Sequence, residues 1–84
     1  MILSWENKGW EEYLYWQETD KYIVKRINEL IKDSLRHPFS GIGKPEPLKE
    51  NLKGYWSRRI TDEHRLVCKV LGEFLIIAQC RYHY

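Results

Sequence analysis

Long apolar segments are missing from this 84-residue sequence. No run approaches the ~18–20 apolar residues that a membrane-spanning helix needs. The N-terminus, MILSWENK, also lacks the basic flank and the longer apolar stretch of a secretory signal peptide. We therefore expect no association with a membrane and a cytoplasmic location.

Cysteine is scarce as well, since Cys68 and Cys80 are the only two thiols. They do not form a CxxC pair, and in a chain without a signal peptide they favour reduced, buried thiols over a disulfide. The three histidines are not spaced with cysteines or carboxylates as zinc ligands are. We predict no metal and no cofactor.

Glycine and proline are few, at 5 and 3 residues, whereas 43% of the residues are apolar and 31% are charged. This composition describes a single globular domain over residues 1–84. A chain of this length buries roughly 60% of the surface that it exposes when unfolded, so it has room for one two-layer core. Any active site must lie on the surface of that core.

Charge is nearly balanced at a formal net charge of +2, but the basic residues gather in the second half. Residues 1–42 carry six Lys/Arg against seven Asp/Glu, and residues 43–84 carry eight against five. Several aromatic residues stand beside basic ones, as in residues 54–59 (GYWSRR) and 81–84 (RYHY). Because cations contact phosphate and aromatic rings stack on unpaired bases, this pattern points to RNA.

Helical periodicity dominates the first half of the chain. Residues 1–5 are short and apolar enough for a strand. Apolar side chains then recur at helical spacing in residues 7–18 and again in residues 20–36. Asp20 offers a cap for the second helix. Because the connection is so short, we expect an antiparallel helical hairpin.

Strand-like segments fill the second half. All three prolines lie within residues 37–47, which excludes a helix or a central strand there. Residues 55–61, 65–70 and 74–84 are rich in β-branched and aromatic residues and predict an antiparallel meander. The order β-α-α-β-β-β implies an α+β fold, in which a two-helix hairpin packs on one face of a mainly antiparallel sheet.

The last turn decides which side chains of the final two strands share a face. If residues 71–73 form a three-residue loop, Val70 faces Phe74. Arg65 and His83 then point the same way, because paired residues share a face. A two-residue turn would separate them, and the sequence leaves both turns open. In the three-residue register, one face carries Arg65, Val67, Lys69, Ile77, Gln79, Arg81 and His83.

Three residues are candidates for metal-free cleavage of RNA. Attack by a ribose 2′-hydroxyl needs a base for its proton, cations for the crowded phosphate and an acid for the leaving oxygen. Glu46 stands between Pro45 and Pro47, which hold its backbone extended. Arg65 offers a planar fork for phosphate oxygens, and His83 offers an imidazole, the side-chain type best suited to giving and taking protons near neutral pH.

Each of these candidates also has a plainer interpretation. Glu46 could be a solvated loop residue, Arg65 an arginine on the exposed face of a strand, and His83 a solvated chain end. Four further residues are ordinary surface cations when taken singly, but together they would form a phosphate-binding field. They are Lys49, Arg58, Arg59 and Arg81.

Several longer strings of the sequence resemble one protein family, the YoeB toxins of the RelE/ParE superfamily. They occur in the expected order and span essentially the whole chain, including its final residues. The strings are residues 10–20 (WEEYLYWQETD), 43–49 (GKPEPLK), 56–61 (WSRRIT), 63–67 (EHRLV) and 80–84 (CRYHY).

This resemblance implies a function and a set of partners. YoeB-type toxins are ribosome-dependent messenger-RNA endonucleases, paired in one operon with an antitoxin of the YefM/Phd type whose disordered tail masks the active site. The resemblance thus implies messenger RNA on the ribosome, with contacts to ribosomal RNA, as the substrate complex. It also favours a homodimer.

The resemblance further implies a role for each site residue. Glu46 would be the general base, Arg65 the clamp on the transition state and His83 the general acid. Cleavage would leave a 2′,3′-cyclic or 3′-phosphate and a 5′-hydroxyl end. Phosphate contacts and stacking would come from Lys49, Arg59 and Tyr84.

Two functions of other classes remain alternatives at this point. A non-catalytic RNA- or ribosome-binding module would use the same cations and aromatic rings only to hold RNA. A gyrase inhibitor of the ParE type shares the fold, but it is not expected to keep a Glu, Arg and His set of this kind.

Overall fold

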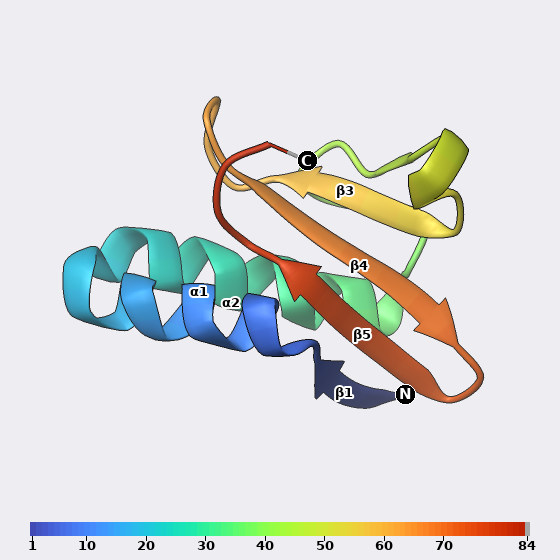
Figure 1. Ribbon diagram of the computed structural model, residues 1–84, viewed down its shortest axis with the longest axis horizontal. Helices are drawn as coiled ribbons and strands as arrows, with labels where there is room; N and C mark the ends of the chain where they lie inside the picture. Colours follow the sequence, from blue (N-terminus) through green and yellow to red (C-terminus); the bar gives the residue numbers. More distant parts are fainter. Residues whose placement is uncertain (84) are drawn as a thin grey trace.

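A helical hairpin and a five-stranded sheet make up the computed structural model, which describes residues 1–83 (Figure 1). Strand β1 (Ile2–Trp5) leads into helix α1 (Asn7–Thr19) and helix α2 (Lys21–Arg36). The second half contains strand β2 (Glu46–Pro47), the 3-10 helix η1 (Glu50–Leu52), and strands β3 (Tyr55–Arg59), β4 (Arg65–Leu71) and β5 (Phe74–Gln79).

The strands follow the order β1-β5-β4-β3-β2. β1 runs parallel to β5, and the other neighbours are antiparallel. The predicted α+β fold, with both helices packed against one sheet, is confirmed. β2 is an addition, because its two residues form an edge strand in a segment predicted to be a loop. An edge position tolerates proline, which cannot complete a ladder on both sides.

The helical hairpin forms where the periodicity predicts it. Asp20 is the single residue between the two helices, and its Oδ1 accepts hydrogen bonds from the backbone N–H groups of Tyr22 and Ile23 at 3.0 and 3.3 Å. α1 passes close to β5 at Gly9, where an added Cβ would lie 2.6 Å from the carbonyl oxygen of Ile77. Only glycine allows this approach.

The core lies between the helices and one face of the sheet. Ile27 and Leu30 of α2 pack with Leu66 and Cys68 of β4, and all four are almost fully buried. Because side chains alternate along a strand, Arg65, Val67 and Lys69 face away from the helices. This alternation places Arg65 on the second face of the sheet.

A two-residue turn joins β4 to β5, so that Leu71 pairs with Phe74. Of the two turns that the sequence left open, the structure thus has the two-residue one, and Val70 pairs with Leu75 instead of Phe74. Gly72 does adopt the left-handed conformation, with φ of 58°. The shorter turn uses this glycine without needing a third loop residue.

An irregularity in β5 changes the register a few residues later. Cys68 pairs with Ile77, whereas Val67 pairs with Gln79. The extra residue returns Val67 and Gln79 to one face, as predicted. Ile77 departs from the prediction, because it faces the core beside Cys68.

Two predicted strands end earlier than expected. β3 stops at Arg59 and β5 stops at Gln79. After β3, the backbone N–H of Ile60 bonds to the carbonyl oxygen of His64 at 3.0 Å, which closes a turn. After β5, Tyr82 has φ of 61°, a left-handed value that no strand can continue.

Candidate active site

Polar residues of the predicted site share the face of the sheet that lies opposite the helices. Glu46 pairs with Ser57, Ser57 pairs with Val67, and Arg59 pairs with Arg65. Directly paired residues point to the same side of a sheet, and here that side is opposite to the core. This surface, called the open face below, carries Glu46, Ser57, Arg59, Arg65 and Val67.

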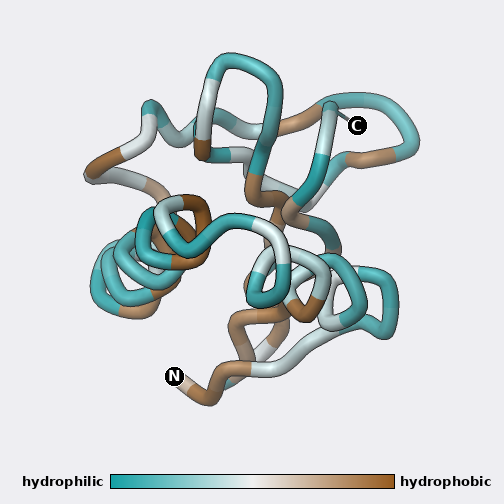
Figure 2. The backbone as a smooth tube through the Cα atoms, turned by 90° about the vertical axis from the view of Figure 1, so that its left-hand side faces the viewer, coloured by the Kyte–Doolittle hydropathy of each residue, from teal (hydrophilic) through white to brown (hydrophobic). Residues whose placement is uncertain are grey.

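The two ends of the open face differ in their surroundings. In both Figure 1 and Figure 2 the segment that follows β5 runs towards the top of the molecule, and the N-terminus lies at the bottom. The loops at the top are largely hydrophilic (Figure 2). Arg59 and Arg65 stand at this end, where β3 stops and β4 begins.

Arg65 is held by the turn that precedes it. Its Nη1 donates to the carbonyl oxygens of Thr61, Asp62 and His64 at 2.7, 3.1 and 3.1 Å. The residue is 8% exposed. Among residues 1–83, no hydrogen bond engages Nη2. One arm of the guanidinium thus fixes the orientation of the other.

His83 reaches the same turn from the C-terminal segment. Its Nε2 lies 3.4 Å from the carbonyl oxygen of Asp62, which also accepts from Arg65 Nη1. Because both nitrogens contact the same oxygen, the separation between Arg65 Nη1 and His83 Nε2 cannot exceed the sum of the 3.1 and 3.4 Å contacts. The structure thus brings Arg65 and His83 together at this turn and not on a shared strand face, because β5 ends at Gln79 before it reaches His83.

Glu46 lies apart from this pair. It is exposed on β2, and two strand spacings separate β2 from β4, roughly 10 Å at about 4.8 Å per spacing. The extended backbone predicted from its two prolines is confirmed. The structure thus places Glu46 on the same face as Arg65 but not in contact with it.

The predicted phosphate-binding residues occupy different surroundings. Arg59 is exposed at the end of β3, directly opposite Arg65. Its backbone N–H bonds to the carbonyl oxygen of Gly43 at 2.7 Å, which anchors the loop before β2. Lys49 is exposed beside η1, next to the buried side chain of Leu48.

Arg58 is not the surface cation that the sequence predicted. It is completely buried on the helix side of β3, where its Nη1 donates to Asp33 Oδ2 at 2.6 Å. Its other contacts are the carbonyl oxygens of His37, Ser40 and Ile42 at 2.6, 2.8 and 3.1 Å. These bonds tie α2 to the proline-containing loop, so that Arg58 is removed from the phosphate-binding set.

Asp33 completes this buried ion pair. Its hydrogen bond from Arg58, together with a second one from the backbone N–H of Ile42, holds the pKa of its carboxyl below the ordinary value of 3.8. The carboxylate therefore stays ionised opposite the arginine at any neutral or mildly acidic pH.

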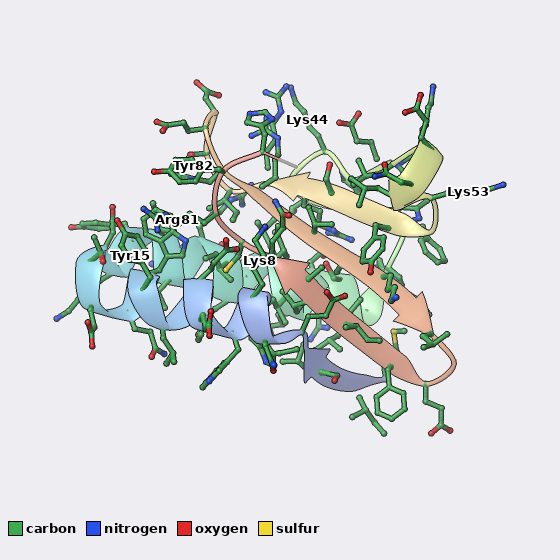
Figure 3. All side chains as sticks on the ribbon, in the orientation of Figure 1. Lys8, Tyr15, Lys44, Lys53, Arg81 and Tyr82 are labelled. Atoms are coloured by element: carbon green, nitrogen blue, oxygen red, sulfur yellow. The ribbon has the colours of Figure 1, made fainter. Side chains whose placement is uncertain are left out.

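Arg81 also departs from its predicted place beside Arg65. Its guanidinium lies 3.8 Å from the ring centroid of Tyr15 on α1 and 4.9 Å from that of Tyr82. Figure 3 shows the three side chains together over α1. This stacking uses the face of the cation against two aromatic rings, which explains why the side chain turns towards the helix.

Side chains that the sequence did not single out hold the C-terminal tail, defined here as residues 80–83. Cys80 is tied to α1, because its N–H donates to Glu12 Oε1 at 2.8 Å and its carbonyl oxygen accepts from Trp16 Nε1 at 2.9 Å. Tyr82 is tied to His64, because the backbone N–H of Tyr82 donates to Nδ1 of His64 at 2.7 Å. Tyr84 lies outside the described residues.

The thiol groups of the two cysteines contribute nothing to the predicted chemistry. Cys68 and Cys80 are free and buried, and burial raises the pKa of their thiols to about 11 and about 12. Thiols of this kind are poor nucleophiles at neutral pH. Within residues 1–83, no three His, Cys, Asp or Glu side chains gather as metal ligands would, and no helix is long and apolar enough to cross a membrane.

Comparison with known proteins places this geometry in context. Residues 5–84 match the family described as YoeB-like toxin of bacterial type II toxin-antitoxin system. The chain is 68% identical to Toxin YoeB of Escherichia coli strain K12 over 84 residues, with full coverage of both chains.

Solved structures of similar proteins share the fold. The YoeB/ParE toxin from Agrobacterium tumefaciens has a TM-score of 0.97 at 52% identity, with all of both chains covered. A chain of the YoeB-YefM complex from Staphylococcus aureus has a TM-score of 0.91 at 48% identity, covering 100% of this chain and 98% of that one.

Proposed function

Since the chain belongs to the family of YoeB-like toxins of bacterial type II toxin-antitoxin systems, we propose that it cleaves messenger RNA on the ribosome with side chains of the open face. The toxin role follows from the family. The reaction, its substrate and the residues that carry it are our proposal.

The proposed reaction is an attack by a ribose 2′-hydroxyl on the adjacent phosphate. Glu46 takes the proton from the hydroxyl as the new O–P bond forms. His83 gives a proton to the 5′-oxygen as the old O–P bond breaks. The products are a 2′,3′-cyclic phosphate, which water can open to a 3′-phosphate, and a 5′-hydroxyl end.

The phosphate gains negative charge during this step and needs fixed cations. Arg65 can supply one, because Nη1 is held by the turn while Nη2 has no partner among the described residues. Arg59 stands directly opposite it, and Lys49 is exposed near Glu46. Preorganised donors of this kind stabilise charge that develops in the transition state.

The observation that carries the proposal is the shared contact of Arg65 and His83 with the carbonyl oxygen of Asp62. It supports the proposal because an imidazole and a guanidinium then lie side by side at one end of the sheet, as an acid and a phosphate clamp would need to. Glu46 faces the same side at roughly 10 Å from β4, a separation that leaves room for a sugar-phosphate unit between base and clamp.

We also propose that an antitoxin of the YefM type covers the open face. The relative from Staphylococcus aureus was solved as a YoeB-YefM complex, and the present chain exposes basic residues at Lys49 and Arg59. An anionic segment laid on these cations would block RNA by charge and by volume.

Glu46→Gln tests the catalytic proposal, with Glu73→Gln as a matched control. Glu73 is exposed in the turn between β4 and β5, away from the open face residues. We expect Glu46→Gln to slow single-turnover cleavage of ribosome-bound messenger RNA by about 10²–10⁴-fold, the usual contribution of a general base. Ribosome binding should not weaken, since losing an anion does not reduce attraction for RNA.

Other outcomes would favour the alternatives. Undiminished cleavage by Glu46→Gln would remove Glu46 from the mechanism. Ribosome binding by the parent protein without any cleavage would indicate a non-catalytic module.

A further inference from the structure

We propose that His64 is a positioning residue, which holds the C-terminal tail so that His83 lies beside Arg65. The inference rests on the proposed role of His83 in cleavage. Its structural half, that His64 anchors Tyr82, can be tested without any cleavage assay.

His64 makes a direct contact with the tail. Its Nδ1 accepts a 2.7 Å hydrogen bond from the N–H of Tyr82, and the backbone N–H of Arg65 donates to the carbonyl oxygen of Tyr82 at 3.1 Å. β5 has already ended at Gln79. His64 at the end of the turn and Arg65 at the start of β4 thus hold both backbone polar groups of Tyr82 in place of a strand partner.

The conformation of Tyr82 makes this anchor necessary. Its φ of 61° lies in the left-handed region, which non-glycine residues adopt only where their surroundings enforce it. The direction that the chain takes at His83 depends on this dihedral angle. Without the bond from His64, Tyr82 could relax to an ordinary conformation and carry His83 away from the carbonyl oxygen of Asp62.

His64 is itself rigidly held, as a positioning residue must be. It is 8% exposed, and its ring packs edge-on against Trp16 with centroids 4.8 Å apart. The backbone N–H of His64 donates to Thr61 Oγ1 at 3.1 Å. Trp16 also donates to the carbonyl oxygen of Cys80, so one indole braces both the histidine and the start of the tail.

The acceptor role also fixes the tautomer. Because Nδ1 accepts from Tyr82, the proton of the neutral ring is on Nε2. If His64 only packed against Trp16, its ring would be sufficient. If it positions the tail, a hydrogen-bond acceptor is required at the Nδ1 position. Two substitutions at His64 distinguish these two roles.

His64→Phe keeps a ring against Trp16 and removes the acceptor, while His64→Asn removes the ring and keeps an oxygen near the Nδ1 position. His37→Phe is the matched control, because His37 is exposed at the end of α2. Each variant is assayed for thermal unfolding, hydrogen exchange of the Tyr82 amide, ribosome binding and single-turnover cleavage of ribosome-bound messenger RNA.

We expect His64→Phe to exchange the Tyr82 amide about tenfold faster than the parent, because one hydrogen bond is lost. Cleavage should fall by about 10²-fold at saturating protein, the scale expected for a small misplacement of a reacting group. Ribosome affinity should stay within about twofold. His64→Asn should melt at a lower temperature and yet cleave within a few-fold of the parent.

Two results would overturn the proposal. Unchanged exchange of the Tyr82 amide in His64→Phe would show that His64 does not hold the tail. Cleavage that follows melting temperature, with His64→Asn impaired more than His64→Phe, would reduce His64 to a packing residue. If His64→Phe does not fold, the cleavage rate of His64→Asn decides: a rate near that of the parent supports the acceptor role, and a strongly reduced rate supports a packing role for the ring.

The proposed function can fail separately. A parent protein that never cleaves ribosome-bound messenger RNA would contradict the function, whereas the exchange rate of the Tyr82 amide would still show whether His64 anchors the tail.

Discussion

Arg58 and Arg65 stand on neighbouring strands, close to each other but on opposite faces of the sheet. Arg58 is 0% exposed, and both of its terminal nitrogens are bonded to Asp33 and to loop carbonyl oxygens. Arg65 has one terminal nitrogen bonded to a turn. The same residue type therefore serves the fold on the helix-covered face and can serve a ligand on the open face.

This difference arises from register and from the loops that each arginine meets. Arg58 lies beneath residues 37–42, where three carbonyl oxygens and the carboxylate of Asp33 engage both terminal nitrogens, and only Nε lacks a partner among the described residues. Arg65 lies at the end of the sheet, where the turn before β4 satisfies only part of the guanidinium. A charge that the protein compensates only in part is the one that can bind a phosphate.

The largest effect that we predict is the dependence on the ribosome. The helix-covered face is closed, while Glu46 and Arg59 of the open face, and His83 in the tail beside it, are exposed. Such a surface cannot by itself align a 2′-hydroxyl with a phosphate, and orientation alone is worth about 10⁵-fold or more. Cleavage of one messenger RNA, naked and on programmed ribosomes, measures the difference. Equal rates would contradict the prediction.

Removal of the last two residues should have the next largest effect. A chain that ends at Tyr82 loses the proposed acid and should cleave about 10²–10⁴-fold more slowly. His83 is exposed and lies beyond the core residues of β5, so circular dichroism and melting temperature should stay near those of the parent. His83→Ala controls for the loss of the final residue. Near-parental cleavage by both folded variants would remove His83 from the mechanism.

Arg58→Ala should act through stability instead of chemistry. It leaves Asp33 and three carbonyl oxygens without their donor, at a cost of about 3 kcal/mol, the low end for a broken buried pair because Asp33 is partly exposed. For a domain of this size the melting temperature should fall by more than ~10 °C. Cleavage per folded molecule, measured at low temperature, should remain near that of the parent. A melting temperature unchanged by Arg58→Ala would contradict the conclusion that the ion pair and hydrogen bonds of Arg58 stabilise the fold.

Acid should weaken the same ion pair by a smaller amount. The pKa of Asp33 is lowered in the folded state, so its contribution to stability is complete above the ordinary value of 3.8 and is lost as the pH falls through the folded-state pKa. Thermal unfolding between pH 7 and pH 2 should show the parent more stable than Asp33→Asn at neutral pH. The difference in melting temperature between the parent and Asp33→Asn should then become smaller in strong acid. A difference that stays constant with pH would show that the charge of Asp33 does not contribute to stability.

Much of the fold could be predicted from the sequence. Helical spacing and the Asp20 cap define α1 and α2 to within about a residue, because both signals are local. The length of the turn between β4 and β5 could not be predicted, because Gly72 fits a left-handed position in a two-residue or a three-residue turn. The irregularity beside Val67 then restored the predicted shared face of Val67 and Gln79.

The candidate site was less predictable than the fold. Chemistry and resemblance identify Glu46, Arg65 and His83, but no local pattern separates Arg58 from Arg59 without the register of β3. The partners of Arg58 lie 16 to 25 residues away, with Asp33 on α2 and the carbonyl oxygens in the segment that follows this helix. His64 gave no signal, because its partner is a backbone N–H on the distant tail.

The central claim is that Arg65 acts on the phosphate in the transition state. Single-turnover cleavage by Arg65→Ala, with messenger RNA already bound on the ribosome, tests it most directly. We expect the rate to fall by about 10²–10³-fold while ribosome affinity changes little, and Arg65→Lys to recover only part of the loss. Loss of ribosome binding with undiminished cleavage in preformed complexes would contradict the claim.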